Sequence, residues 1–126
     1  MTKPYIIWNV NGKDYRLRMT TFNAMQVEKQ LGMGATEALN HLMDSRVIVG
    51  MLWGGLQKYH HGMNLREVCD LYDDYLAGGG NAEKIIDILM QLLAQIGIGD
   101  TESSAEDDAK NVESPAATPA ESGMTL

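Results

Sequence analysis

The sequence predicts a mainly α-helical domain over residues 1–99, which begins with a β-hairpin and is followed by a disordered acidic tail over residues 100–126. Three observations support this fold class. An Asn-Gly pair separates two strand-like segments near the N-terminus. Apolar residues then recur at helical spacing in four to five segments that are bounded by capping residues or glycines. Beyond Asp100 large apolar residues nearly vanish, and such a segment buries too little surface to offset the entropy of ordering.

The hairpin is expected over residues 5–18. Segments Tyr5–Val10 and Lys13–Arg18 flank Asn11-Gly12, a pair that tolerates the positive φ angles of a type I′ turn. Alternation places Ile6, Trp8 and Val10 on one face of the first strand, and Tyr15, Leu17 and Met19 on one face of the second. Because an isolated hairpin is marginally stable in water, we expect it to dock on the helices or on another chain.

Two helices are expected after the hairpin. Thr20 and Thr21 are N-cap candidates for the first helix, and Gly32 ends it. The apolar residues assigned to this helix are Phe22, Met25 and Leu31. Thr36 is the expected cap of a second, short helix. Its apolar positions are Leu39 and Met43.

The next segment is predicted to be the central, most buried helix. Ser45 is its expected cap, and the helix runs from Arg46 to about His60 before Gly62 closes it. Apolar residues surround nearly its whole circumference, which is typical of a helix enclosed by its neighbours. These residues are Val47, Ile48, Val49, Met51, Leu52, Trp53, Leu56 and Tyr59.

Two further helices complete the domain. Asn64 and Glu67 have the spacing of a capping box, and Gly78-Gly79-Gly80 ends the helix that they open. Its apolar stripe comprises Val68, Leu71, Tyr72, Tyr75 and Leu76. Asn81 caps the last helix, which reaches Gly97. Its apolar residues are Ile85, Ile86, Ile88, Leu89, Leu92, Leu93 and Ile96.

Composition excludes several classes of protein. Residues 1–99 carry nine Lys or Arg and ten Asp or Glu, whereas residues 100–126 carry seven acids and only Lys110. No basic cluster of the kind that nucleic-acid binding requires is present, so we expect no DNA or RNA partner. The longest apolar stretch, Val47–Leu56, is far shorter than a membrane span. With no signal-like N-terminus and Cys69 as the only cysteine, the chain is expected in a reducing cytoplasm.

No residue pattern indicates an enzyme, a cofactor or a metal site. Adjacent His60 and His61 point to different sides of a helix, and His41 adds no ligand spacing, so a polar helix end is the expected role. The carboxylates of Asp70, Asp73 and Asp74 are expected on a solvated helix face. Cys69 is expected to be a small buried residue, because it sits beside Val68 and Leu71 and has no basic neighbours that would activate its thiol.

Three glycines within the central helix are the unusual feature. Each glycine costs about 1 kcal/mol relative to alanine in a helix interior, so Gly50, Gly54 and Gly55 imply a compensating gain. One interpretation is close helix packing inside the domain. The other is a groove that receives a partner segment. The partner-binding residues predicted on the second interpretation are Gly50, Trp53, Gly54, Leu56, Tyr72 and Tyr75.

Nine methionines form a second unusual feature. Core filling is the ordinary role, and it is expected for Met25, Met43, Met51 and Met90. The alternative is an adaptable apolar surface, since methionine suits variable partners. Met33 and Met63 lie in predicted loops, where a core role is less secure.

Taken together, these landmarks resemble the tail assembly chaperones of long-tailed, siphovirus-like bacteriophages and prophages. The resemblance covers about residues 5–98. It rests on the N-terminal NVNGKDYRLRMTTFNAMQVEKQLG, a hairpin followed by a Thr-led helix that ends in Leu-Gly. It rests also on VIVGMLWGGLQKYHHGMNLREVCDLYDDYL, an apolar helix with Trp-Gly-Gly-Leu, a break near His-Gly and a helix of Leu-x-x-Val type.

The resemblance implies a function that composition alone does not. Such chaperones coat the aggregation-prone tape measure protein, help recruit tail tube protein, and leave before the virion is complete. The implied location is the cytoplasm of the bacterial host, with self-association as a further possibility. Many such chaperones occur in a short form and a frameshifted long form, and the chain ending at Leu126 fits the short form.

Three alternatives stand beside this interpretation. The first is another phage morphogenesis or adaptor protein, such as a head–tail completion factor, which would remain in the mature particle. The second is an acidic inhibitor that mimics DNA, although the acids here gather in the tail rather than in the near-neutral body. The third is a small enzyme, which the lack of a catalytic pattern disfavours.

Overall fold

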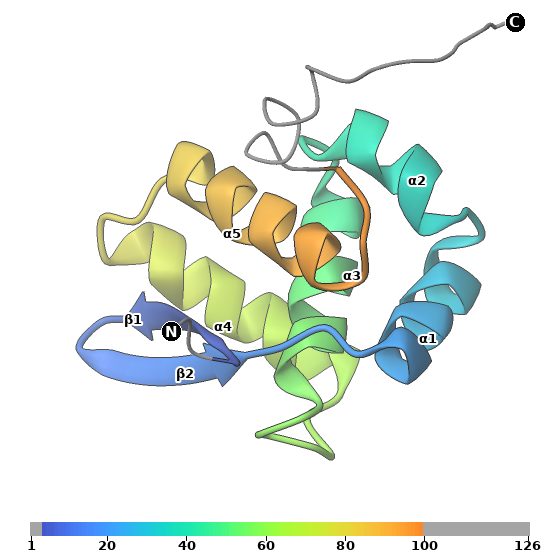
Figure 1. Ribbon diagram of the computed structural model, residues 1–126. Coiled ribbons are helices and arrows are strands. Elements are labelled where there is room, and N and C mark those ends of the chain that lie inside the picture. Colours follow the sequence, from blue (N-terminus) through green and yellow to red (C-terminus); the bar gives the residue numbers. More distant parts are fainter. Residues whose placement is uncertain (1–3, 100–126) are drawn as a thin grey trace, which may run out of the picture.

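A glycine-containing helix, α3, passes through the middle of the domain, and the other elements pack around it (Figure 1). The computed structural model describes residues 4–99. Its elements are β1 (Ile6–Val10), β2 (Lys13–Leu17), α1 (Thr21–Leu31), α2 (Ala35–Ala38), a 3₁₀ turn η1 (Leu39–His41), α3 (Ser45–Leu56), α4 (Leu65–Ala77) and α5 (Ala82–Gln95). The prediction of a mainly α fold with an N-terminal hairpin is therefore confirmed.

The hairpin has the predicted turn and the predicted buried face. Asn11 and Gly12 have φ angles of 51° and 92°, the left-handed values that a type I′ turn needs at both central positions. The strands are antiparallel and pair Trp8 with Tyr15 and Val10 with Lys13. Trp8, Val10 and Leu17 are buried, because β1 packs against α4 and α5 while β2 packs against α3. The hairpin thus docks on the helices of its own chain.

Helix α1 begins and ends as predicted. The Thr20 hydroxyl accepts a hydrogen bond from the Asn23 N–H at 3.0 Å, and Gly32 ends the helix in the left-handed conformation with φ of 75°. Of the apolar residues expected on α1, Leu31 is buried, whereas Phe22 and Met25 are exposed. The buried face consists of Ala24, Val27 and Leu31.

The start of α2 corrects the prediction that Thr36 caps this helix. Gly34 is the N-cap residue, and Thr36 lies inside the first turn. The Ala35 N–H finds its acceptor in the side chain of Glu28, at 2.8 Å from Oε2. A carboxylate from the preceding helix therefore takes the capping role, and no side chain within α2 is needed for it.

The central helix α3 is as buried as predicted but starts and ends elsewhere. Asp44 stands at the N-cap, so the predicted cap, Ser45, is the first helical residue. The helix ends at Leu56 instead of His60. Continuation would require the Gly55 carbonyl oxygen to accept from residue 59. That oxygen accepts instead from the N–H of Arg18, the residue that follows β2, at 2.8 Å.

Helices α4 and α5 begin at the caps that the sequence predicts. The Asn64 side chain accepts from the Glu67 N–H and the Glu67 side chain accepts from the Asn64 N–H, both at 2.8 Å, which is the expected capping box. The Asn81 side chain accepts from the Lys84 N–H at 3.0 Å. One assignment on α4 is wrong, because Leu76 is 42% exposed and lies outside the buried stripe.

The core forms where α3 meets the other elements. Its fully buried side chains include Met51, Leu52 and Leu56 of α3, and Ile85, Leu89, Leu92 and Leu93 of α5. The core role predicted for methionine holds only for Met51. Met25, Met43 and Met90 are exposed, whereas Met33 and Met63 are half-buried against the core.

Two further sequence predictions concern the acidic tail and the absence of a membrane span. The acidic tail predicted over residues 100–126 lies outside the described residues. Among residues 4–99, no helix is both long and apolar enough to cross a membrane.

Candidate partner-binding site

The three glycines of α3 face side chains of their own domain. A methyl group of Val27 occupies the space that a Cβ atom at position 54 would need. A Cβ atom at position 50 would lie 3.2 Å from Leu31 Cδ2, and one at position 55 would lie 3.1 Å from Leu92 Cδ1. These glycines let α1 and α5 approach α3 closely. Internal packing is therefore their role in this fold, and the predicted groove for a partner backbone is already filled.

The six residues predicted to bind a partner do not form one surface. Gly50, Gly54 and Leu56 are buried inside the domain. Tyr75 is also buried: its hydroxyl donates to the Asn81 carbonyl oxygen at 2.9 Å and accepts from the Asn81 N–H at 3.2 Å. It joins the end of α4 to the start of α5.

Trp53 and Tyr72 are half-buried and belong to different surroundings. Tyr72 stacks on Tyr75 with ring centroids 6.1 Å apart, and Tyr75 in turn contacts Trp8 of the hairpin. Burial, and then the neighbouring Tyr75, raise the pKa of Tyr72. Trp53 lies instead beside α1, so the structure separates the two aromatic anchors that the sequence analysis grouped together.

An apolar surface that the sequence analysis placed in the core lies on α1. Phe22 is 66% exposed and Met25 is 58% exposed. Phe22 and Trp53 line a shared hollow of about 350 Å³ between α1 and α3. The remaining lining residues are Asn23, Gln26, Gly54, Gln57 and His61. We name Phe22, Met25 and Trp53 the α1 surface.

A signal for the orientation of α1 was present in the sequence. Ala24, Val27 and Leu31 follow the i, i+3, i+7 spacing of one helix face, and this face meets the glycines of α3. Small residues on one helix require a partner that fills the space above them. Because Phe22 and Met25 lie off this stripe, matching the two helices would have left both residues outside the core.

A second hollow, of about 390 Å³, lies where α1, α3 and α4 meet. Its apolar lining includes Leu31, Val49 and Leu65, with Arg46 and Cys69 at the same site. The Arg46 guanidinium donates to the Leu31 carbonyl oxygen at 2.9 Å and links α3 to the end of α1. Cys69 is half-buried here, not fully buried as predicted.

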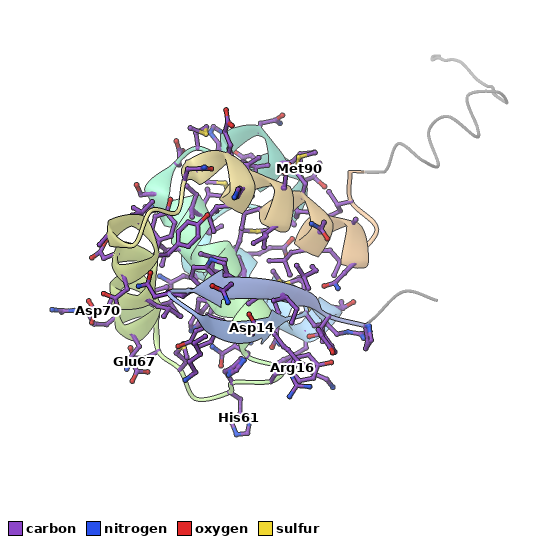
Figure 2. The ribbon with its side chains drawn as sticks, turned by 90° about the vertical axis from the view of Figure 1, so that its left-hand side faces the viewer. Asp14, Arg16, His61, Glu67, Asp70 and Met90 are labelled. Atoms are coloured by element: carbon purple, nitrogen blue, oxygen red, sulfur yellow. The ribbon has the colours of Figure 1, made fainter. Side chains whose placement is uncertain are left out.

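His60 and His61 were expected at the end of the central helix, but α3 ends at Leu56, before both residues. His60 lies in the turn after α3, where its Nε2 accepts the Arg16 N–H at 3.2 Å and its ring packs on Tyr15. Burial lowers the pKa of His60, and the nearby charges of Arg16 and Lys13 lower it further. His61 is exposed beside it, and Figure 2 shows its side chain directed away from the domain.

The carboxylates of Asp70, Asp73 and Asp74 lie exposed on α4, as predicted for a solvated face. Over residues 4–99, no group of three or more His, Cys, Asp and Glu side chains is arranged to hold a metal ion. The α1 surface is thus the feature of the described domain with the clearest binding character, since large apolar side chains exposed together are typical of interaction sites.

No protein-family model, no curated protein and no solved structure matches this chain.

Proposed function

We propose that this protein is a tail assembly chaperone of a long-tailed bacteriophage or prophage. It binds apolar helical segments of the tape measure protein and helps recruit tail tube subunits in the host cytoplasm, and it is absent from the mature virion. The resemblance of residues 5–98 to that family supports the proposal. The order of elements supports it too, because a hairpin, a Thr-led helix, an apolar helix and a helix of Leu-x-x-Val type follow one another in the order of the family's landmarks.

The observation that carries the proposal is the α1 surface. Phe22 and Met25 are three residues apart on α1, so their side chains lie on one side of the helix, and both are mostly exposed. Leaving this area in water is unfavourable by roughly 25 cal/mol for each Å² that a partner would cover. A chaperone for apolar helices gains from such a surface because it recovers this free energy when the client binds.

The composition of the α1 surface suits a variable client. Methionine has an unbranched, flexible side chain that adapts to different apolar shapes, whereas Phe22 and Trp53 supply rigid aromatic contact area. The polar lining of the adjacent hollow consists of neutral amides and His61, so the surface sets no strict charge requirement. The expected client is a long helical protein that offers an apolar helix face at several positions along its length.

The test compares two variants of the full chain, each co-expressed with the tape measure protein of the same phage. Phe22→Ser/Met25→Ser removes the two exposed apolar side chains of the α1 surface. Leu76→Ser is the control, because Leu76 is also exposed but lies on α4, on the other side of α3 from α1 (Figure 1). Circular dichroism melting establishes that both variants are folded.

We expect the double variant to lose most co-purification and to leave the tape measure protein insoluble, while Leu76→Ser behaves as the unsubstituted chain. A folded double variant that still solubilises the tape measure protein would rule out the α1 surface. Failure of the unsubstituted chain to bind that protein would rule out the function. Mass spectrometry of purified virions separates a chaperone, which is absent, from a head–tail completion factor, which remains.

A further inference from the structure

The exposed residue Arg16 of the hairpin lies against a pair of tyrosine rings, Tyr5 and Tyr59. Its guanidinium carbon lies 5.3 Å from the centroid of the Tyr5 ring and 4.9 Å from that of the Tyr59 ring. The two rings meet edge to face, with centroids 5.7 Å apart. Cation–π contacts of this kind orient an arginine side chain before any ligand arrives, so less conformational entropy is lost when it binds.

The N–H groups of this guanidinium are available. The guanidinium carries five N–H donors in one plane, and a ring contact takes up none of them as a conventional hydrogen bond. Within residues 4–99 the Arg16 side chain has no hydrogen bond and no ion pair, and the only ion pair in that range joins His41 and Asp44. A preoriented guanidinium with free in-plane donors is the arrangement that binds carboxylates in bidentate fashion.

Other cations accompany Arg16. Arg18 follows directly after β2 and donates from Nη1 to the Pro4 carbonyl oxygen at 3.3 Å, and Lys58 is exposed next to Tyr59 in the chain. Burial is the main cause of the lowered pKa of His60, and the positive charges of Arg16 and Lys13 lower it further. We name Tyr5, Arg16, Arg18, Lys58 and Tyr59 the Arg16 surface. Its charge and its donors fit an acidic peptide.

The strongest concentration of acid in this protein is in its own C-terminal segment. Residues 100–126 carry seven Asp or Glu and one Lys. The carboxylates of Glu67 and Asp70 on α4 are a weaker match, since Figure 2 shows them beside the hairpin and not at the end where Arg16 lies, and Glu67 is engaged in its capping box.

The end of α5 lies close to the Arg16 surface, and the acidic segment follows after a short stretch that turns toward α2 (Figure 1). The Pro4 carbonyl oxygen that accepts from Arg18 accepts in addition from Gln95, the last residue of α5, at 3.5 Å. Asp100 follows only a few residues later, and an extended chain spans roughly 3.3–3.6 Å per residue. Covalent attachment gives such a segment an effective concentration in the millimolar range.

We propose that the acidic segment of residues 100–126 binds the Arg16 surface of its own chain, with carboxylates against the in-plane N–H groups of Arg16. The contact covers a charged surface of the domain, and an acidic partner would have to displace the segment to bind there. The Arg16 surface is distinct from the apolar α1 surface.

The test uses the full chain labelled with ¹⁵N and records amide chemical shifts. Arg16→Lys keeps the charge but removes the planar donors, and Arg66→Lys is the matched control at an exposed arginine of α4. We expect Arg16→Lys to move the amide signals of residues 100–113, and Arg66→Lys to leave them in place. The signals of Trp8 and Tyr15 in the same spectra report whether the hairpin stays folded.

A second variant approaches the contact from the other side. Neutralising Glu102, Glu106, Asp107 and Asp108 to their amides is expected to shift the signals of Arg16, Arg18 and Tyr59. Raising NaCl from about 0.05 M to about 0.5 M should produce the same shifts, because salt screens the attraction. Acidic-segment signals that respond neither to Arg16→Lys nor to salt would overturn the proposal. Shifts that disappear on dilution would also overturn it, since the ligand would then be the segment of a second copy.

Discussion

A methyl group of Val27 on α1 lies where the side chain of any larger residue at position 54 would begin, so Val27 and Gly54 together determine how closely α1 approaches α3. The Met19 side chain, which follows the hairpin, would lie 3.4 Å from a Cβ atom at position 54 and fills the space on that side. The free energy that a glycine costs in a helix interior is thus offset by close packing of two helices.

The first prediction concerns this contact. Gly54→Ala forces Val27 or the α1 backbone to move, and we expect a loss of about 1–3 kcal/mol in the free energy of unfolding. Urea denaturation measures it. Gly34→Ala is the matched control, because a Cβ atom there meets only Glu28 Oε2 at 3.8 Å and the backbone angle is unstrained. Equal stability of the two variants would contradict the assignment.

The same contact allows a test of coupling. Val27→Ala removes the methyl groups that obstruct position 54, at the cost of a small cavity. Combined with Gly54→Ala, it should therefore lose less stability than the sum of the two single changes. Additive losses would show that the two residues do not interact.

The second prediction concerns the hairpin turn. Gly12 has a φ of 92°, which β-branched residues resist, so Gly12→Val is expected to destabilise the domain by about 1–2 kcal/mol. Gly12→Asn is the control, because asparagine tolerates left-handed angles and should cost less. Thermal melting of both variants, with the NMR signals of Trp8 and Tyr15 as local probes, checks the turn. Unchanged stability of the valine variant would mean that the turn is not required.

The third prediction concerns pH. Burial, Arg16 and Lys13 together hold the pKa of His60 below its usual value, and its neutral Nε2 accepts the Arg16 N–H. The unfolded chain therefore binds a proton at His60 more readily than the folded chain does. This contribution to stability is present in full above about pH 6.5 and is lost as the pH falls through 6.5 toward the lower folded pKa.

Urea unfolding at about pH 7.5 and about pH 5.5 measures this effect. We expect His60→Gln to reduce the stability difference between the two conditions, because the titrating group is gone. His61→Gln, at the exposed neighbour, should leave the difference unchanged. The carboxylates titrate alike in all three chains and cancel from the comparison. An identical pH dependence in the unsubstituted chain and His60→Gln would refute the role of His60.

Residue type and spacing were enough to predict the local features of this protein. The Asn11-Gly12 turn, the Thr20 and Asn81 caps, and the capping box of Asn64 and Glu67 are all formed as predicted. Each of them depends on atoms within about three residues, so residue type and spacing carry the whole signal. The burial of α3 could be predicted in the same way, because its apolar residues leave no polar face.

Contacts between residues far apart in the sequence replace local ones at several places, and these could not be predicted from local patterns. Arg18 takes the Gly55 carbonyl oxygen and α3 ends at Leu56, and Glu28 takes the Ala35 N–H in place of a local cap. The outward position of Phe22 and Met25 is of the same kind, because it depends on Val27 and Leu31 filling the space above Gly54 and Gly50. A helix with apolar residues on two sides buries the side that fits its partner, and that choice is made by the packing of whole elements.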